Sequence, residues 1–267
     1  ARRNVVLKHR TQTLYTDSLN YDRLWGNAYF YDGGKLVDGK DQLVSDWGTY
    51  NTATKEAVFY YHVVMLSDGQ RVETDTLHYD TKTSQAHVLG PSVITKDSMV
   101  INTRNGIFDN KNDKSQLFDR STVVNEGKTI TGDTLLYDKT TGDANGFGNV
   151  IYVDTKNKNE LYGDILYYNE KTGNGLATKN ALVKDYSQND TLYVHGDSIK
   201  LFTYNIDTDS VYRRVHCYNK VRAYRVDLQA MCDSLVADSR DSCMIMYNDP
   251  IVWNEGRQVV GEMIKVY

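Results

Sequence analysis

Proline is almost absent from this chain of 267 residues, which holds only 2 prolines and 3 cysteines. Linkers rich in proline or serine are missing, so we draw no internal domain boundary. No apolar run approaches the roughly 20 residues that cross a bilayer as a helix, and no helical period is sustained. Basic residues do not dominate, since 31 lysines and arginines stand against 35 acidic residues. The balance excludes the basic footprint of a nucleic-acid-binding protein.

The few cysteines, Cys217, Cys232 and Cys243, all lie in the last third of the chain. An odd number cannot pair completely within one chain. Cys232 and Cys243 could form a disulfide in an oxidising compartment, but their positions do not face each other in a simple hairpin register. We therefore expect free or partly buried thiols.

Tyrosine, in contrast, is frequent, with 21 residues, and its amphipathic ring suits a half-buried pleated surface. The stretch Thr131–Val153 has the pattern of a complete β-hairpin. Side chains alternate between two faces from residue 134 to 137, a DKTTG turn follows at residues 138–142, and residues 147–153 are aromatic and β-branched. The composition and this stretch both favour a β-rich fold.

The hairpin is repeated along the chain. Each copy is marked by an acidic residue after a small one, with an arginine in one degenerate copy, at intervals of 29 to 36 residues: Asp17, Asp46, Asp75, Arg104, Asp133, Asp164, Asp197, Asp233 and Glu262. Self-similarity at this period is typical of stacked units that bury a shared core. We predict a single domain over residues 1–267, of about nine two-strand repeats, trimmed at one or both ends.

Apolar side chains hold fixed positions within each repeat. Leu or Ile stands two residues after the acidic position and Tyr often four after it, so both share one face of a strand. Another apolar residue stands three before the acidic position, with the opposite parity. We predict a β-bulge or corner at the small and acidic pair, which turns both sets inward.

Possible catalytic and metal sites are better explained by the repeat. The block Gly196-Asp197-Ser198-Ile199 is similar to the GDSL motif of a hydrolase family, yet GDTL at Gly132 and GDIL at Gly163 occupy the same column. No partner histidine or aspartate is arranged for a nucleophile. One carboxylate per repeat is too few for calcium, so we expect each to accept backbone N–H bonds at the corner. The 6 histidines show no metal spacing; no catalytic residue, metal or cofactor is predicted.

A local basic cluster stands in the repeat that begins at Asp197: Arg213, Arg214, Lys220, Arg222 and Arg225. A solvated face is the ordinary interpretation of such a cluster. Contact with phosphate groups is the alternative.

The consensus G-D-x-L-x-Y-D-x-x-T-G, followed by Ala and then G-N-V, resembles the repeat of the OstA-like family, which includes LptA and the amino-terminal domain of LptD. Residues 132–150 match it almost throughout, and residues 163–173, 74–86 and 16–22 match in part. The resemblance implies an all-β fold in which antiparallel hairpins form an elongated β-jellyroll slab (β-taco) of two facing sheets. It also implies a non-enzymatic, periplasmic role in lipopolysaccharide transport to the outer membrane. Its implied partners are lipopolysaccharide and other Lpt-type proteins, or the chain itself through edge-strand pairing, and no nucleic acid.

Within such a slab the apolar columns are the predicted lipid-binding groove for the acyl chains of lipid A. Burying a methylene is favourable by about 0.8 kcal/mol, so acyl chains need no directional contacts. The predicted groove residues are Leu19, Tyr21, Val63, Met65, Leu77, Tyr79, Leu135, Tyr137, Val150, Tyr152, Leu166, Tyr168, Ile199 and Leu201. Stacked side chains could fill the interior instead. The alternative function is a structural or protein-interaction slab that assembles through exposed edge strands without lipid; a polysaccharide-acting parallel β-helix is disfavoured by the tight hairpin turns.

Overall fold

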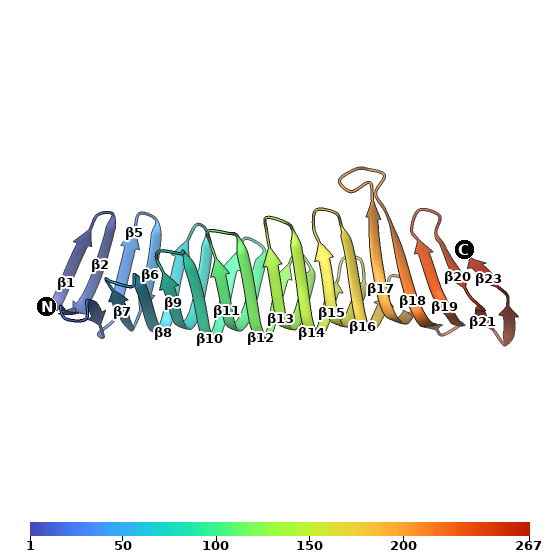
Figure 1. The fold of residues 1–267 in the computed structure, drawn as a ribbon, viewed down its shortest axis with the longest axis horizontal. Helices are drawn as coiled ribbons and strands as arrows, with labels where there is room; N and C mark the ends of the chain where they lie inside the picture. The colour runs from blue at the N-terminus through green and yellow to red at the C-terminus, as the bar shows by residue number, and fades with distance from the viewer. The chain divides into compact units, whose positions relative to one another are not determined.

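The computed structural model describes residues 1–267. All regular elements are β-strands, and no helix long and apolar enough to span a membrane is present. The chain divides into two compact units, residues 1–126 and residues 127–267, and each is described by itself. The predicted all-β fold of antiparallel hairpins is confirmed within each unit (Figure 1). That one domain runs over residues 1–267 stays a prediction.

The first unit contains twelve strands in the order of the chain (Figure 1). They are β1 Arg2–His9, β2 Gln12–Ser18, β3 Asn20–Asp22, β4 Asn27–Phe30, β5 Gly34–Asp38, β6 Asp41–Ser45, β7 Trp47–Asn51, β8 Glu56–Ser67, β9 Gln70–Asp80, β10 Gln85–Lys96, β11 Met99–Asp109 and β12 Lys114–Asn125. From β8 to β12, each strand pairs antiparallel with the next.

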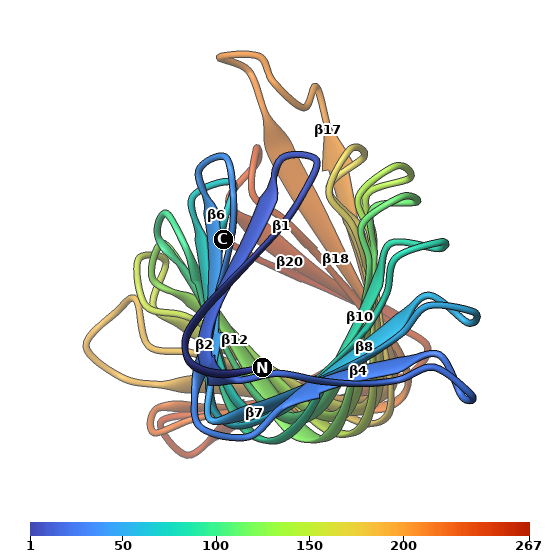
Figure 2. The same ribbon diagram turned by 90° about the vertical axis from the view of Figure 1, so that its left-hand side faces the viewer.

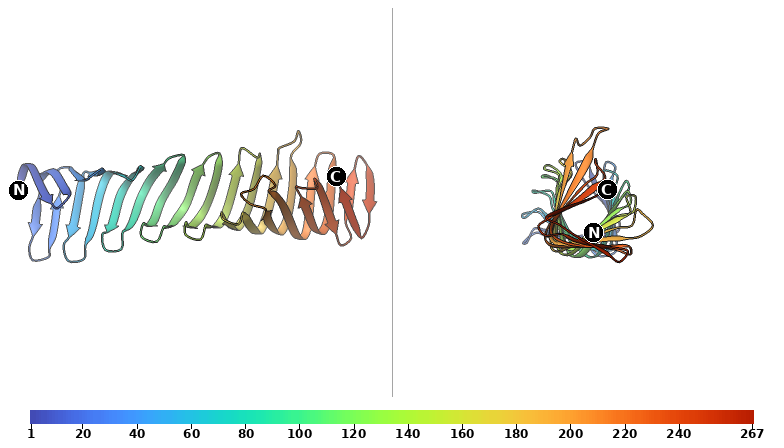
Figure 3. Two further views of the ribbon diagram at one scale, coloured as in Figure 1. Left: turned by 90° about the horizontal axis from the view of Figure 1, so that it is seen from above. Right: turned by 90° about the vertical axis from the view of Figure 1, so that its right-hand side faces the viewer.

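The second unit contains the remaining strands, and each strand up to residue 238 pairs antiparallel with the next (Figure 1). They are β13 Lys128–Asp138, β14 Asp143–Asp154, β15 Asn159–Asn169, β16 Asn174–Asp185, β17 Leu192–Tyr204, β18 Tyr212–Arg225, β19 Leu228–Asp238, β20 Cys243–Tyr247, β21 Ile251–Asn254, β22 Arg257–Val260 and β23 Met263–Val266. Seen from above, the successive strands of each unit run side by side at a slant (Figure 3).

The hairpin turns form as their sequence predicts. The Asp138 carboxylate accepts the backbone N–H of Thr140 at 2.9 Å and of Thr141 at 3.2 Å, and the Gly142 N–H donates to the Asp138 carbonyl at 2.8 Å. Gly142 has φ of 80°, a left-handed conformation that glycine adopts without a steric penalty. The turn is therefore specified by contacts within five residues of sequence.

Each long hairpin is bent at the small and acidic pair. Between β15 and β16 the register shifts between Tyr162 and Ile165, which flank Gly163-Asp164. The extra residue lies in the return strand, where Lys179 and Asn180 have φ of 58° and 60°. The same shift recurs in the pairs β8 with β9, β13 with β14 and β17 with β18. The predicted bulge is confirmed, and the structure places its extra residue in the strand opposite the small and acidic pair.

The two facing sheets of each unit are two halves of the same strands. Strand β8 runs through the bend and pairs with both β6 and β7, which are separated from each other at Asp46. Figure 2 shows β6 and β7 running in different directions on the two sides of this bend. We call the two halves the walls, and the surface that faces the opposite wall the inner face.

Candidate functional site

The inner face collects the apolar side chains from both sides of the bend. Val72, three residues before Asp75, is 3% exposed, and Leu77, two residues after it, is 1% exposed. Val194 and Ile199 hold the same two positions around Asp197 and are 7% and 4% exposed. A regular strand would point the members of each pair to opposite faces. The bend is what brings both to one side.

Small residues allow neighbouring strands to pack closely at the bend. In the first unit the residue before the acidic position is a buried hydroxyl side chain: Thr16, Ser45, Thr74 and Thr103. The Thr16 hydroxyl donates to the Gly33 carbonyl at 2.7 Å. In the second unit the position holds glycine, except for the buried Cys232 before Asp233, and a Cβ at Gly196 would lie 3.1 Å from the Tyr218 carbonyl oxygen. Strands therefore approach closely at the bend in both units, and no buried side-chain nitrogen or oxygen lacks a hydrogen-bond partner.

Exposure of the inner face rises with distance from the bend. On β15, Leu166 is 7% exposed, whereas Tyr168, two residues nearer the turn on the same face, is 42% exposed. In the first unit Leu19 is half-buried and Tyr21, two residues further on, is 58% exposed. The inner face is thus closed at the bend and accessible toward the hairpin turns. The exposed part of the inner face therefore carries apolar and tyrosine side chains.

In the first unit, alanine and tyrosine alternate across the strands in the part of the inner face that lies nearer the turns. Ala57 stands opposite Tyr50 on one side and Tyr79 on the other, and Ala86 is the second neighbour of Tyr79. Ala28 likewise stands opposite Tyr50. A methyl group beside each ring leaves room for the ring to lie over the sheet. The result is an amphipathic row whose hydroxyls are the polar tips.

The predicted groove residues fall into three groups by exposure. Those beside the bend are buried: Val63, Leu77, Leu135, Val150, Leu166 and Ile199. Those farther out are half-buried: Leu19, Met65, Tyr79, Tyr137, Tyr152 and Leu201. Two are exposed: Tyr21 and Tyr168. That these side chains contact lipid stays a prediction.

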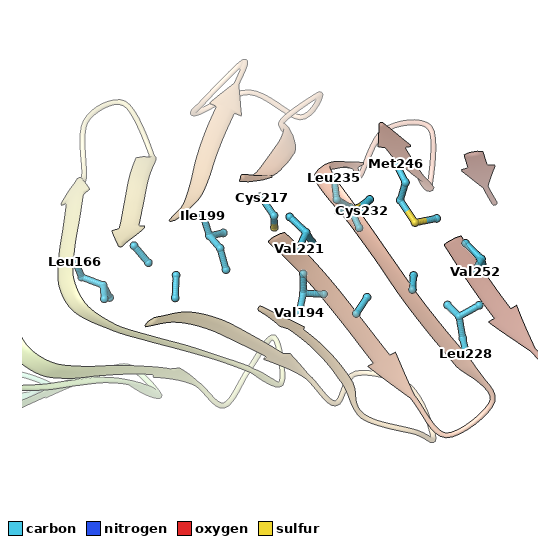
Figure 4. Close-up of a cluster of buried hydrophobic side chains, with 14 of the residues drawn as sticks. Leu166, Val194, Ile199, Cys217, Val221, Leu228, Cys232, Leu235, Met246 and Val252 are labelled. Atoms are coloured by element: carbon cyan, nitrogen blue, oxygen red, sulfur yellow. The ribbon is translucent and has the colours of Figure 1, made fainter. Parts of the chain in front are cut away.

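In the second unit, Val150, Leu166 and Ile199 belong to one cluster of buried apolar side chains, and Tyr152 packs against it. Figure 4 shows ten labelled members of this cluster. The members that lie outside the predicted groove set are Ala177, Ala181, Val194, Cys217, Val221, Ala223, Leu228, Ala230, Cys232, Leu235, Met246 and Val252. Many of them lie on return strands, where the extra residue shifts the alternation, so periodicity counted along the outgoing strand did not find them.

The regularly spaced acidic residues make two kinds of contact at the bend. Asp17 accepts the backbone N–H of Asn4 at 2.8 Å, whereas Asp46 Oδ2 lies 2.7 Å from His62 Nδ1. Asn4 and His62 each belong to a left-handed pair in a neighbouring strand. The predicted backbone contact is present at Asp17. At Asp46, Asp164 and Asp233 the observed contact is with a side chain instead: His62, Asn180 and Asn248 respectively.

The three cysteines are buried free thiols. Burial is the main cause that raises the pKa of Cys217 to about 12, and the nearby Cys232 contributes to this shift. Both thiols belong to the same buried cluster. No group of three or more His, Cys, Asp or Glu side chains is placed to hold a metal ion, and Ser198 occupies an ordinary ladder position opposite Tyr218.

The fold and the inner face define a class of protein: an all-β chain of bent antiparallel hairpins whose repeated apolar side chains lie on one face. Residues 1–75 match the family model described as OstA-like protein. The resemblance found in the repeats is therefore confirmed over that part of the chain. No curated protein matches the chain.

Among solved structures, the chain is similar to LptH from Pseudomonas aeruginosa, described as the LptA-homologous periplasmic component of the conserved lipopolysaccharide transport device. The two are 16% identical, and the match covers 52% of this chain and 94% of that chain at a TM-score of 0.38.

Proposed function

We propose that this protein binds lipopolysaccharide by its acyl chains and carries it across the periplasm toward the outer membrane, without enzymatic activity. The acyl chains lie against the inner face of the bent hairpins, and the sugar and phosphate portion stays at the accessible side. The predicted groove residues, from Leu19 to Leu201, supply the contacts.

One observation carries this proposal: the inner face is apolar, buried at the bend and increasingly exposed toward the turns, as Leu166 and Tyr168 show at 7% and 42%. In a fully packed core, the row of side chains nearer the turns would be buried as well as the row beside the bend. Repetition of the surface from hairpin to hairpin provides neighbouring sites of similar affinity, which movement of a lipid along the groove requires. The OstA-like match of residues 1–75 supports the same class of cargo.

Two adjacent tyrosines allow a matched test. Tyr168 is on the inner face and 42% exposed, whereas Tyr167 is on the outer face and 40% exposed. Photo-crosslinking amino acids at the two positions would therefore be equally accessible but would point to opposite faces of the sheet. In cells that make lipopolysaccharide, we expect a lipid adduct from position 168 and none from position 167. Adducts from both positions, or from 167 alone, contradict a groove on the inner face.

The second candidate function is a protein-interaction slab that assembles through edge strands. Strand β22 pairs only with β21, and its Val259 and Val260 are 53% and 63% exposed. An unpaired apolar edge is a template for strand addition. Val259→Lys would then abolish self-association in sedimentation experiments. Native mass spectrometry of the same variant tests transport separately: lipid that remains bound to the Val259→Lys chain supports transport, and a chain without lipid supports the interaction function.

A further inference from the structure

His78 and His87 stand directly opposite each other on the outer face of the first unit. They are cross-strand partners in the β9 and β10 ladder, and their ring centroids are 6.1 Å apart. The next pair along the ladder, Leu77 opposite Val88, is buried, so alternation turns the two histidines away from the inner face. Residues 81–84 of the hairpin turn separate the two strands in sequence, which is why spacing along the chain did not reveal the pair.

The separation of the two rings suits a metal ion held between them. A zinc–nitrogen bond to imidazole is about 2.1 Å long, which places the ion about 3 Å from the centre of each ligating ring. Two rings that share one ion therefore have centres about 5 to 6 Å apart, depending on the angle at the metal. The observed 6.1 Å is at the upper end of this range. A small rotation of the His78 side chain, which is exposed, completes the approach.

His87 is held by a hydrogen bond that leaves one ring nitrogen for a metal ion. Its Nε2 lies 2.8 Å from Asn105 Oδ1, and because an amide oxygen only accepts hydrogen bonds, Nε2 is the protonated nitrogen. Nδ1 then carries the lone pair that a metal ion takes. Asn105 is in β11 and His78 is in β9, so the two lie on opposite sides of β10. A second ring nitrogen that donates to an oxygen is the usual arrangement of a metal-ligating histidine.

The surroundings of His78 favour the neutral imidazole, which is the form that binds metal ions. Desolvation is the main cause that lowers the pKa of His78, and the neighbouring His87 contributes to this shift, whereas Glu56 opposes both. Glu56 stands opposite Asp80, two residues along β9 from His78. His78 is therefore ready to ligate at neutral pH without first losing a proton.

A row of carboxylates follows on the turn side of the two histidines. Glu56 and Asp80 are cross-strand partners in β8 and β9, and Asp109 ends β11 in the same row. Asp80 accepts the Lys82 backbone N–H at 2.7 Å and Asp109 that of Asn112 at 3.0 Å, so these two oxygens serve their turns. The charge of the row attracts a cation. No third His, Cys, Asp or Glu is placed to join the histidines, so water completes the coordination.

We propose that His78 and His87 form a binding site for a divalent transition-metal ion on the outer face of the first unit. Two neutral imidazoles favour copper, nickel and zinc, which accept nitrogen ligands, over magnesium and calcium, which prefer oxygen. Bound there, the ion joins the neighbouring strands β9 and β10. Asn105 is a positioning residue that acts through His87. The site is independent of the proposed function, because it lies on the face opposite the predicted lipid-binding residues.

The test uses copper(II) and zinc ions bound to the purified chain. Electron paramagnetic resonance of the copper ion counts the nitrogens bound to it, and we expect splitting from two imidazole nitrogens at one ion per chain. His78→Gln and His87→Gln each leave one nitrogen. Each also weakens zinc binding in calorimetry by at least about tenfold, since even residues that only position a ligand contribute that much. Both side chains lie on the outer face, so circular dichroism is expected to show an unchanged fold.

His195 provides the matched control. It is exposed on the outer face of the second unit and stands opposite Leu182 and Arg222, with no histidine partner. His195→Gln keeps both the two-nitrogen copper spectrum and the zinc affinity. A spectrum with one nitrogen or none in the unmodified chain overturns the site, as do equal losses of zinc affinity in His195→Gln and His87→Gln.

Asn105 tests the geometry without removal of a ligand. Asn105→Ala removes the acceptor of the His87 Nε2–H, and we expect zinc affinity to fall about tenfold while two nitrogens remain in the copper spectrum. Asn105→Asp keeps an acceptor oxygen and restores the affinity. An Asn105→Ala chain that binds zinc as tightly as the unmodified chain would overturn the role given to this hydrogen bond.

Discussion

The hydroxyl oxygens of Thr74 and Ser92 lie 2.7 Å apart inside the bend of the first unit. The Ser92 hydroxyl also lies 2.8 Å from the Gly90 carbonyl oxygen, and the Thr74 hydroxyl lies 3.2 Å from the Leu89 carbonyl oxygen, so either hydroxyl can donate to the other. Thr103 and Ser121 repeat the pair at the same distance one hairpin further along. These hydroxyls satisfy carbonyl groups that the bulge removes from the ladder.

Thr74→Val keeps the shape of the side chain and removes this donor. Because the site is buried, we expect a loss of about 1 to 2 kcal/mol in the free energy of unfolding. Thr74→Ser keeps the donor and costs less. Thr54→Val, at an exposed turn position, is the control and leaves stability unchanged. Denaturant unfolding measures all three, and an unaffected midpoint for Thr74→Val would show that the pair contributes nothing.

Gly90 is required by both its conformation and its neighbour. Its φ is 85°, and a Cβ there would lie 2.6 Å from Asp75 Oδ2. Gly90→Ala therefore adds a steric clash to backbone strain, and we expect it to cost about 1 to 3 kcal/mol. Gly69→Ala is the matched control, because Gly69 has φ of 73° with nothing within 4 Å of a Cβ. Gly90→Ala is the more damaging of the two, and Asp75→Ala in the same chain restores part of the loss; equal melting temperatures would contradict the clash.

The turn aspartates make stability depend on pH. The hydrogen bond from the Lys82 backbone N–H is the main cause that lowers the pKa of Asp80 from its ordinary value of 3.8. A carboxylate whose pKa is lower in the folded state stabilises it above the ordinary value, and that contribution is lost as the pH falls through the folded pKa. Asp80→Asn removes the titration and keeps the turn, since Asn51 holds the equivalent position and its Oδ1 accepts the Ala53 N–H at 2.9 Å.

We therefore expect the melting temperature of Asp80→Asn to lie below that of the unmodified chain at neutral pH, where the carboxylate contributes, and to fall less steeply in acid. Thermal unfolding followed by circular dichroism across this range makes the measurement. Parallel acid profiles for the two proteins would show that Asp80 is not held more strongly as a carboxylate in the folded state.

The cysteine thiols are expected to be unreactive. Burial raises the pKa of Cys217 to about 12 and that of Cys232 to about 11, and Cys243 is 5% exposed. The thiolate is the reactive form, so a thiol-specific reagent at mildly alkaline pH labels the chain slowly until it is unfolded. Rapid labelling of the native protein, or a linked Cys232 and Cys243 peptide under non-reducing conditions, would contradict this result.

Local contacts made part of this fold predictable. The Asp138 turn forms from contacts within residues 138–142, so its sequence was sufficient. The bend was predicted from a conflict of parity, because Val72 and Leu77 cannot share a face of a straight strand. The strand that holds the extra residue could not be predicted. Its left-handed residues, Lys179 and Asn180, are not glycines, so the sequence gives no sign of their conformation.

The sequence alone determined the β-hairpins, their period and the apolar columns, because alternation and turn chemistry depend on residues that are neighbours in the chain. Only the tertiary structure decided how deep each column lies, with Leu166 at 7% exposed and Tyr168 at 42%. These depths depend on the bend of each hairpin and on the register of successive strands, and both arise from backbone pairing between segments that no local pattern connects.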